Sequence, residues 1–106
     1  MRRVALVPAP TTDVKRVILH ACDAGVYVFP SASTEDAGGL GDEWYETVDA
    51  ALQACREAYG IEDKMWQDVP DPEPGCQHDW IAPVRVRDGV MERRENSEWV
   101  PFVARR

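Results

Sequence analysis

Residues 14 to 30, VKRVILHACDAGVYVFP, decide the fold class. Two runs rich in β-branched and aromatic residues, 14 to 22 and 26 to 30, flank the connector Asp23-Ala24-Gly25. Such runs are typical of strands, and a glycine in the connector adopts the positive φ that a tight turn requires. The stretch therefore predicts a β-hairpin, and with it an antiparallel sheet.

Further candidate strands lie on both sides of this hairpin. They cover residues 4 to 7, 44 to 45, 80 to 87, 90 to 94 and 99 to 103. Asp88-Gly89 is a strong two-residue turn, which predicts that the strands on either side of it pair antiparallel. Pro101 confines the last strand to a sheet edge, because proline donates no ladder hydrogen bond.

One amphipathic helix is predicted from about Val48 to Tyr59. Its apolar residues recur at helical spacing and form one inward-facing stripe: Val48, Leu52, Cys55 and Tyr59. Thr47 is expected to cap the helix start, and Gly60 to end it in the left-handed conformation. The sequence thus predicts an α+β fold, a mostly antiparallel sheet of about four to six strands covered by this helix, in a single domain spanning residues 1 to 106.

The overall charge disfavours several classes of partner. The chain has 106 residues, with 19 acidic and 12 basic residues and a net charge of -7. That charge opposes a sequence-independent grip on nucleic-acid phosphates or anionic lipid. The apolar run after Arg3 ends at Pro8, too soon for a signal peptide, and no stretch approaches the ~18 apolar residues of a membrane helix. We therefore expect a cytoplasmic protein that binds neither nucleic acid nor membrane.

The acidity is concentrated in the middle of the chain. Residues 31 to 80 hold thirteen acidic and two basic residues, a net charge of -11, and Pro70, Pro72 and Pro74 stiffen an acidic loop within them. This pattern favours a small non-enzymatic binding module, of the inhibitor or immunity type, that engages a basic protein partner by electrostatic steering. The residues expected to bind the partner combine aromatic anchors with charge: Trp66, Asp71, Glu73, Asp79 and Trp80. Solubility alone also accounts for an acidic composition.

An alternative function is a zinc-stabilised module. The two histidines each lie two residues from a cysteine, and positions i and i+2 of an extended chain point to the same face. The candidate ligands are His20, Cys22, Cys76 and His78. The simpler interpretation is that the cysteines are small buried apolar residues and the histidines make ordinary hydrogen bonds.

A less favoured alternative is a small cysteine-dependent enzyme. Cys76, His78 and Asp79 supply the residue types of a nucleophile, a base and an orienting group. Working triads, however, converge from distant segments rather than from neighbouring positions. The odd number of cysteines, three, excludes a full disulfide framework and favours reduced thiols, with a single bridge between Cys22 and Cys76 left open.

Several motifs together resemble small stand-alone bacterial proteins of uncharacterised function. They are DEWYETV at residues 42 to 48, Tyr59-Gly60-Ile61, Trp66, and PGCQHDWIAPVRV at residues 74 to 86. The resemblance covers about the central half of the chain. It implies a compact one-domain bacterial protein and carries no activity or cofactor with it.

Overall fold

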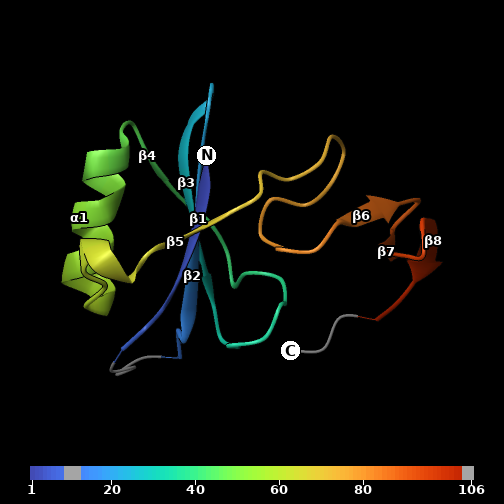
Figure 1. The fold of residues 1–106 in the computed structure, drawn as a ribbon, viewed down its shortest axis with the longest axis horizontal. Coiled ribbons are helices and arrows are strands. Elements are labelled where there is room, and N and C mark those ends of the chain that lie inside the picture. Colours follow the sequence, from blue (N-terminus) through green and yellow to red (C-terminus); the bar gives the residue numbers. More distant parts are fainter. Residues whose placement is uncertain (9–12, 104–106) are drawn as a thin grey trace.

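The computed structural model describes residues 1–8 and 13–103 and consists of two antiparallel sheets and one α-helix (Figure 1). The large sheet has the order β4-β3-β2-β1-β5, with bounds β1 Arg2–Leu6, β2 Arg16–Cys22, β3 Gly25–Ser31, β4 Glu43–Tyr45 and β5 Gln67–Val69. The small sheet has the order β6-β7-β8, with bounds β6 Val84–Arg87, β7 Val90–Glu95 and β8 Glu98–Pro101. Helix α1 spans Val48–Tyr59, and a 3-10 helix, η1, spans Asp63–Met65. The predicted α+β class with mostly antiparallel strands is confirmed.

Both predicted two-strand turns are present. Strands β2 and β3 pair from Arg16 opposite Ser31 to Cys22 opposite Gly25, and Gly25 has a φ of 124°, which favours glycine. Between β6 and β7, Asp88 and Gly89 have φ values of 52° and 77°. Two consecutive positive φ angles are the requirement of the tight turn that matches strand twist, so the local sequence determines both hairpins.

Helix α1 begins and ends where its capping residues indicate. The Thr47 side chain accepts a hydrogen bond from the Ala50 backbone N–H at 3.1 Å. Gly60 adopts a left-handed conformation, with a φ of 67°, and its N–H donates to the Arg56 carbonyl. The chain then folds back, placing the Ile61 side chain in the core with 0% exposure.

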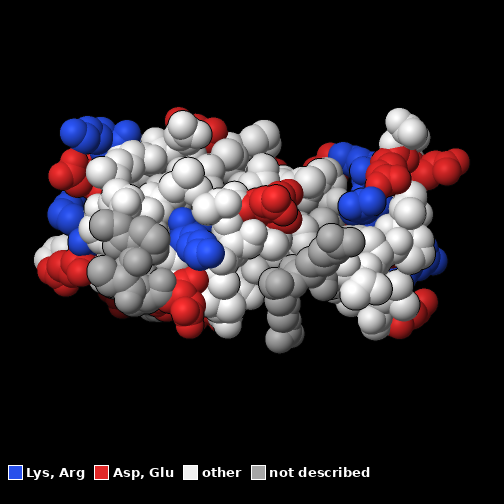
Figure 2. Space-filling model, turned by 90° about the horizontal axis from the view of Figure 1, so that it is seen from below, with Lys and Arg blue, Asp and Glu red and all other residues white. Residues whose placement is uncertain are grey.

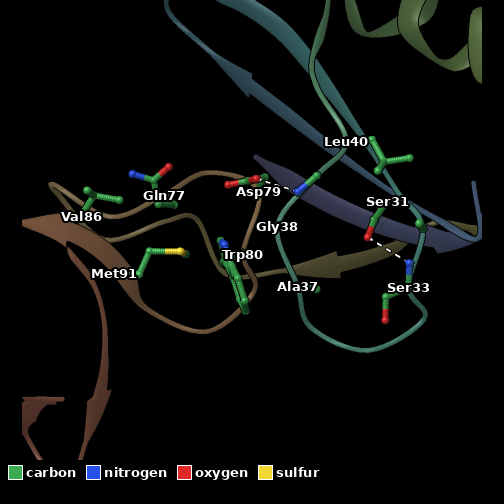
Figure 3. Close-up of a pocket in the computed structure, with 12 residues that line it drawn as sticks. Ser31, Ser33, Ala37, Gly38, Leu40, Gln77, Asp79, Trp80, Val86 and Met91 are labelled. Carbon is green, nitrogen blue, oxygen red and sulfur yellow. Dashed lines mark hydrogen bonds between the residues drawn. The ribbon is translucent and has the colours of Figure 1, made fainter. Parts of the chain in front are cut away.

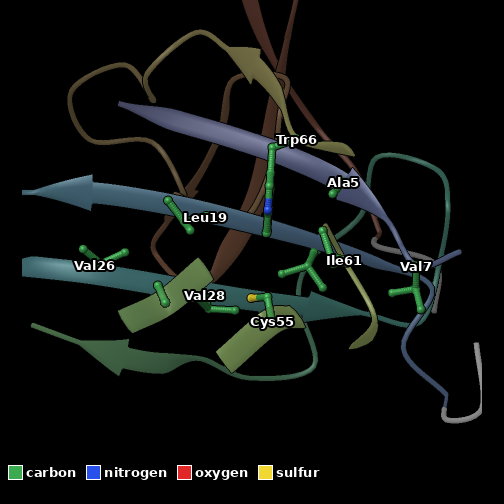
Figure 4. Packing of buried hydrophobic residues seen from close by; sticks show 10 residues of the cluster. Ala5, Val7, Leu19, Val26, Val28, Cys55, Ile61 and Trp66 are labelled. Atoms are coloured by element: carbon green, nitrogen blue, oxygen red, sulfur yellow. The ribbon is translucent and has the colours of Figure 1, made fainter. Parts of the chain in front are cut away.

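The main core lies between α1 and one face of the large sheet (Figure 4). Ala51 and Cys55 of the helix pack with alternate residues of the central strands, such as Leu19 and Val28, all nearly inaccessible to solvent. The outer positions of the predicted stripe are half-buried around this centre: Val48, Leu52 and Tyr59. Trp66, on the chain after η1, closes the same cluster.

Two expectations about the strands are wrong. The strands form two sheets rather than one, and the strand expected over residues 80 to 87 begins only at Val84. The backbone groups of residues 78 to 82 are bonded by side chains instead of by a neighbouring strand, as described below. Strand β5, which pairs with β1 opposite residues 2 to 4, has too few apolar residues to be recognised in the sequence.

The other face of the large sheet is covered by two irregular segments. Residues 70 to 83, here the connecting segment, run from β5 across this face and lead into the small sheet (Figure 1). Residues 32 to 42, here the glycine loop, join β3 to β4 on the same side. In the part of the chain that the structure describes, no helix is long and apolar enough to cross a membrane.

Candidate functional site

A buried arginine attaches the connecting segment to the large sheet. Arg2 lies on β1 with 2% exposure, and its guanidinium donates hydrogen bonds to four backbone carbonyls. The acceptors, with their distances, are Pro70 (2.7 Å), His78 (3.2 Å), Trp80 (2.6 Å) and Ile81 (3.1 Å). Burial lowers the pKa of Arg2, and Asp36 and Asp71 oppose that shift. A planar group with five donors suits four converging carbonyls better than any other side chain.

A second set of charged side chains attaches the glycine loop. The Asp36 carboxylate accepts the N–H groups of Ile81 and Ala82, both at 2.8 Å. Arg16, 4% exposed on β2, donates to the Ala37 carbonyl at 2.9 Å and forms a longer ion pair with Asp36 at 3.8 Å. These contacts join the glycine loop, the connecting segment and the large sheet into one packed unit.

A cavity of about 380 Å³ lies between the glycine loop and the small sheet (Figure 3). Val86 and Met91 form its wall on the small-sheet side, and Asp79 and Trp80 lie between them and the glycine loop. The remaining lining residues are Ser31, Ala32, Ser33, Ala37, Gly38, Gly39, Leu40 and Gln77. Asp79 Oδ2 accepts the Gly39 N–H at 2.7 Å, which fixes one edge of its carboxylate. Sites of roughly 300 to 1,000 Å³ that are mostly apolar with a few polar groups are typical of ligand binding.

A half-exposed aromatic surface lies on the side of the large sheet that also faces the cavity. Trp44, 51% exposed on edge strand β4, lies opposite Tyr27 in the strand register, and the Tyr27 and Phe29 rings stack at 6.1 Å. The Trp44 indole N–H donates to the Ala24 carbonyl at 2.9 Å, and a Cβ on Gly25 would lie only 2.2 Å from that nitrogen. Gly25 therefore leaves the space in which the indole is held, and Trp44 is fixed without being buried.

Carboxylates flank this aromatic surface. Asp42 and Glu46 bracket β4, and Asp23 precedes the carbonyl that accepts the Trp44 indole N–H. All three are exposed, and none has an ion-pair partner among the residues that the structure describes. We call Trp44, Tyr27 and Phe29 with these three carboxylates the Trp44 surface.

The residues predicted to bind a partner are placed differently from what their sequence context indicates. Trp66 and Trp80 are 9% and 8% exposed and pack inside the protein, so neither presents an exposed ring as the expected surface anchor. Asp71 and Glu73 are exposed, but Asp71 pairs with the Met1 ammonium at 3.1 Å and Glu73 with Arg94 at 2.7 Å. Asp79 lines the cavity.

The predicted zinc ligands come together only in part. His20 Nδ1 and His78 Nδ1 lie 3.1 Å apart, with their rings edge to face. Cys22 is exposed at the hairpin end and Cys76 is buried, and all three cysteines are free thiols. Within residues 1–8 and 13–103, no group of three or more His, Cys, Asp or Glu side chains is placed to hold a metal ion.

Each residue of the candidate thiol triad makes contacts with other parts of the chain. His78 contacts His20, Asp79 bonds the Gly39 N–H, and Cys76 is buried with its own N–H donating to the Glu73 carbonyl at 2.9 Å. Cys55, in the core, has its pKa raised to about 12 by burial, with Glu43 adding to the shift. A thiol with so high a pKa is a poor nucleophile at neutral pH.

Sequence reasoning missed the groups that build this site. Arg2, Arg16 and Asp36 are charged residues near predicted strand ends or loops, where exposure is the ordinary expectation. Trp44 lies in a predicted strand, but nothing local distinguishes an exposed tryptophan from a buried one. The available signal is that Arg16 lies inside a predicted strand, directly before the apolar residues Val17, Ile18 and Leu19.

No protein-family model, curated protein or solved structure matches this chain. The interpretation of the site therefore depends on its own geometry.

Proposed function

We propose that the protein is a small non-enzymatic binding module, of the inhibitor or immunity type, that engages a basic protein partner through the Trp44 surface. The observation that carries the proposal is a half-exposed indole held in place by the Ala24 carbonyl and flanked by carboxylates that have no ion-pair partner within the described part of the chain. Fixed aromatic side chains bind partners at low entropic cost, and surrounding charges speed association with an oppositely charged surface.

The distribution of the acids of residues 31 to 80 supports this location. Many of them have intramolecular cationic partners: Asp36, Glu62, Asp63, Asp68, Asp71 and Glu73. Figure 2 shows one face of the molecule, on which acidic and basic side chains are interspersed. Asp42 and Glu46 have no such partner among the residues that the structure describes, so their field is less compensated than that of the paired acids and is available to an incoming cation.

The first test compares immobilised wild-type protein with two charge variants in capture from a lysate of the source organism. Neutralising Asp42 and Glu46, as Asn and Gln, should slow association with the captured basic protein and flatten its salt dependence. The matched control neutralises Asp71 and Glu73 in the same way, because those carboxylates already have partners within the chain. A stronger effect of the control pair would place the interface on the connecting segment and contradict the proposal that the Trp44 surface binds the partner.

A second variant separates the anchor from the charges. Trp44→Ala should increase the dissociation rate of the captured partner roughly 30-fold, as expected when a hot-spot residue worth about 2 kcal/mol is removed. Its association rate should change little. Retention of no basic protein at low salt by the wild type would refute the proposed function.

The zinc-stabilised module is a second candidate, favoured by the 3.1 Å approach of the two histidine Nδ1 atoms. Two ligands of one tetrahedral zinc ion would lie at a comparable separation, about 3.3 Å, if each bond is ~2.05 Å long. Elemental analysis of protein purified without chelator, with zinc supplied, tests it. One equivalent of zinc and a lower melting temperature after chelation are expected, whereas metal-free protein of unchanged stability would refute it.

A further inference from the structure

We propose that the cavity between the glycine loop and the small sheet is a pocket for one arginine side chain, which is presented by the basic partner. This inference rests on the proposed function and names the group by which the partner would be recognised. The Trp44 surface and the cavity lie on the same side of the large sheet, the side opposite α1. Phe29 of β3 lies between the two. Its ring stacks on Tyr27 of the Trp44 surface, and its Cβ lies 3.4 Å from the position that a Cβ on Gly39 of the glycine loop would occupy.

The polar end of the cavity has the chemistry of a guanidinium site. Asp79 is the one charged residue among those that line it. Its Oδ2 accepts the Gly39 N–H, which leaves Oδ1 to accept from a ligand. Ser31, Ser33 and Gln77 also line the cavity. The Ser31 and Ser33 hydroxyl oxygens already accept the Ser33 and Glu35 N–H groups, at 3.3 and 3.0 Å, and each retains a second lone pair, while Gln77 carries an amide oxygen. A guanidinium offers five donors in one plane, so it suits several acceptors better than an ammonium does.

The remaining wall matches the stem of the same side chain. Val86 and Met91 face the glycine loop across the cavity, with the Trp80 ring beside them (Figure 3). Arginine carries three methylene groups that pack on apolar surface, and its planar head stacks on aromatic rings. The chain already uses this contact, because the Arg85 guanidinium lies 4.2 Å from the Trp99 ring centroid and that of Arg93 lies 5.6 Å from the Phe102 centroid.

Gly38 keeps this space open. A Cβ at residue 38 would lie 3.3 Å from Trp80 Nε1 and 3.4 Å from Asp79 Oδ2, closer than most side-chain contacts. A side chain there would cover the two groups to which the ligand would bind. The absence of a side chain at this position therefore serves access to the cavity.

The charges around the cavity favour a cation. Behind the lining, Arg16 is already bonded to the Ala37 carbonyl and paired with Asp36, and Asp79 also acts on it by raising its pKa against the larger effect of burial. Arg2 also interacts with Asp36, so Asp36 is balanced by buried guanidinium groups, and the charge that the cavity itself presents is the Asp79 carboxylate. An incoming cation would meet this carboxylate, whereas an anion would be repelled by it.

The test uses small probes, so that it does not depend on identifying the partner. Butylguanidinium is titrated into labelled full-length protein, and the indole N–H signals of the tryptophans are followed by NMR. We expect the Trp80 signal to shift with a dissociation constant of roughly 1 to 10 mM, the range for a ligand of this size. Neutral butylurea should bind at least tenfold more weakly, and butylammonium more weakly than butylguanidinium.

Two variant pairs locate the binding. Asp79→Asn keeps an acceptor for the Gly39 N–H and should weaken butylguanidinium binding roughly tenfold or more, whereas Asp49→Asn, exposed on α1 and outside the cavity, should leave it unchanged. Val86→Lys places a positive charge on the cavity wall and should abolish the Trp80 shift. Val90→Lys is its matched control, because Val90 has similar exposure, 47% against 51%, and does not line the cavity.

The outcomes separate this inference from the proposed function. Equal binding of butylguanidinium and butylurea, or equal effects of Val86→Lys and Val90→Lys, would overturn the arginine pocket. If a basic partner still binds through Trp44 but butylguanidinium does not bind in the cavity, the arginine pocket is refuted and the proposed function stands. If Asp79→Asn fails to fold, the two lysine variants decide the question alone.

Discussion

At the scale of single residues, His20 shows how burial and neighbouring charges act on one titratable group. It is 6% exposed on β2 and contacts the His78 ring, and burial lowers its pKa below the ordinary value of 6.5. His78, the Met1 ammonium and Arg2 act in the same direction, and Asp71 opposes them. Folding therefore favours the neutral ring over the protonated ring, relative to the unfolded chain.

This shift predicts that acid destabilises the protein through His20. Because the unfolded chain takes up the proton more readily than the folded protein does, stability should fall as the pH drops below about 6.5, and this loss should end once the pH is below the folded pKa. Urea unfolding at pH 7.5 and 5.5 measures it. His20→Asn should reduce the difference between the two pH values, and an unchanged difference would show that other groups cause it.

At the scale of elements, α1 is determined by its own sequence but is positioned by two small residues. Ala51 and Cys55 are 0% and 1% exposed against the sheet, while Leu52 lies at the rim of the contact. A second contact holds the helix end, since the Glu43 carboxylate of β4 accepts the hydroxyl groups of Tyr45 and Tyr59 at 2.7 and 3.0 Å. The bond to Glu43, together with burial, raises the pKa of Tyr45 to about 12.

The helix contact predicts that a larger side chain at residue 51 is worse than a smaller one at residue 52. Ala51→Leu should lower the free energy of unfolding by about 1 to 3 kcal/mol, because no space lies beside a fully buried alanine. Leu52→Ala should lower it by about 1 to 2 kcal/mol, less than the ~2 to 5 kcal/mol for a fully buried leucine. Chemical denaturation measures both. Ala50→Leu, exposed on the same helix, is the control and should stay within about 0.5 kcal/mol of the wild type.

At the scale of the whole molecule, the two sheets are joined by side chains rather than by a shared ladder. Arg2 and Asp36 bond the backbone of the connecting segment, and the Trp80 ring packs edge to face on Phe102 at 5.5 Å. The cavity exists only because these contacts place the small sheet beside the glycine loop. Any ligand that spans the cavity therefore bridges both sheets.

This arrangement predicts that Arg2→Lys loosens the connecting segment. A lysine ammonium cannot reach four carbonyls at once, so the free energy of unfolding should fall by about 3 to 5 kcal/mol, as when one partner of a buried charged group is removed. Amide exchange should accelerate over residues 77 to 82 and the small sheet more than in β2 and β3. The control is Arg3→Lys, which alters an exposed pair with Asp68 and should change stability by no more than about 1 kcal/mol. Equal effects would show that the carbonyl contacts of Arg2 do not hold the segment.

Features that depend on neighbouring residues could be predicted from the amino-acid sequence. The hairpin at Gly25, the turn at Asp88-Gly89 and the bounds of α1 follow from local backbone preference and capping, which act within a few residues. The contact between His20 and His78 could be proposed from the sequence because the chain has no other histidines.

Which polar and aromatic residues are buried depends on the tertiary fold and could not be predicted from local sequence. Trp44 and Trp80 are both flanked by an acid in the chain, yet one is half-exposed and the other lines a cavity between two sheets. Arg2 is buried because four backbone carbonyls converge on it from residues that are 68 to 79 positions later in the sequence. Such contacts depend on how distant segments pack together, and local propensity contains no information about that packing. The candidate binding site depends almost entirely on these long-range contacts, whereas the fold class follows from local patterns.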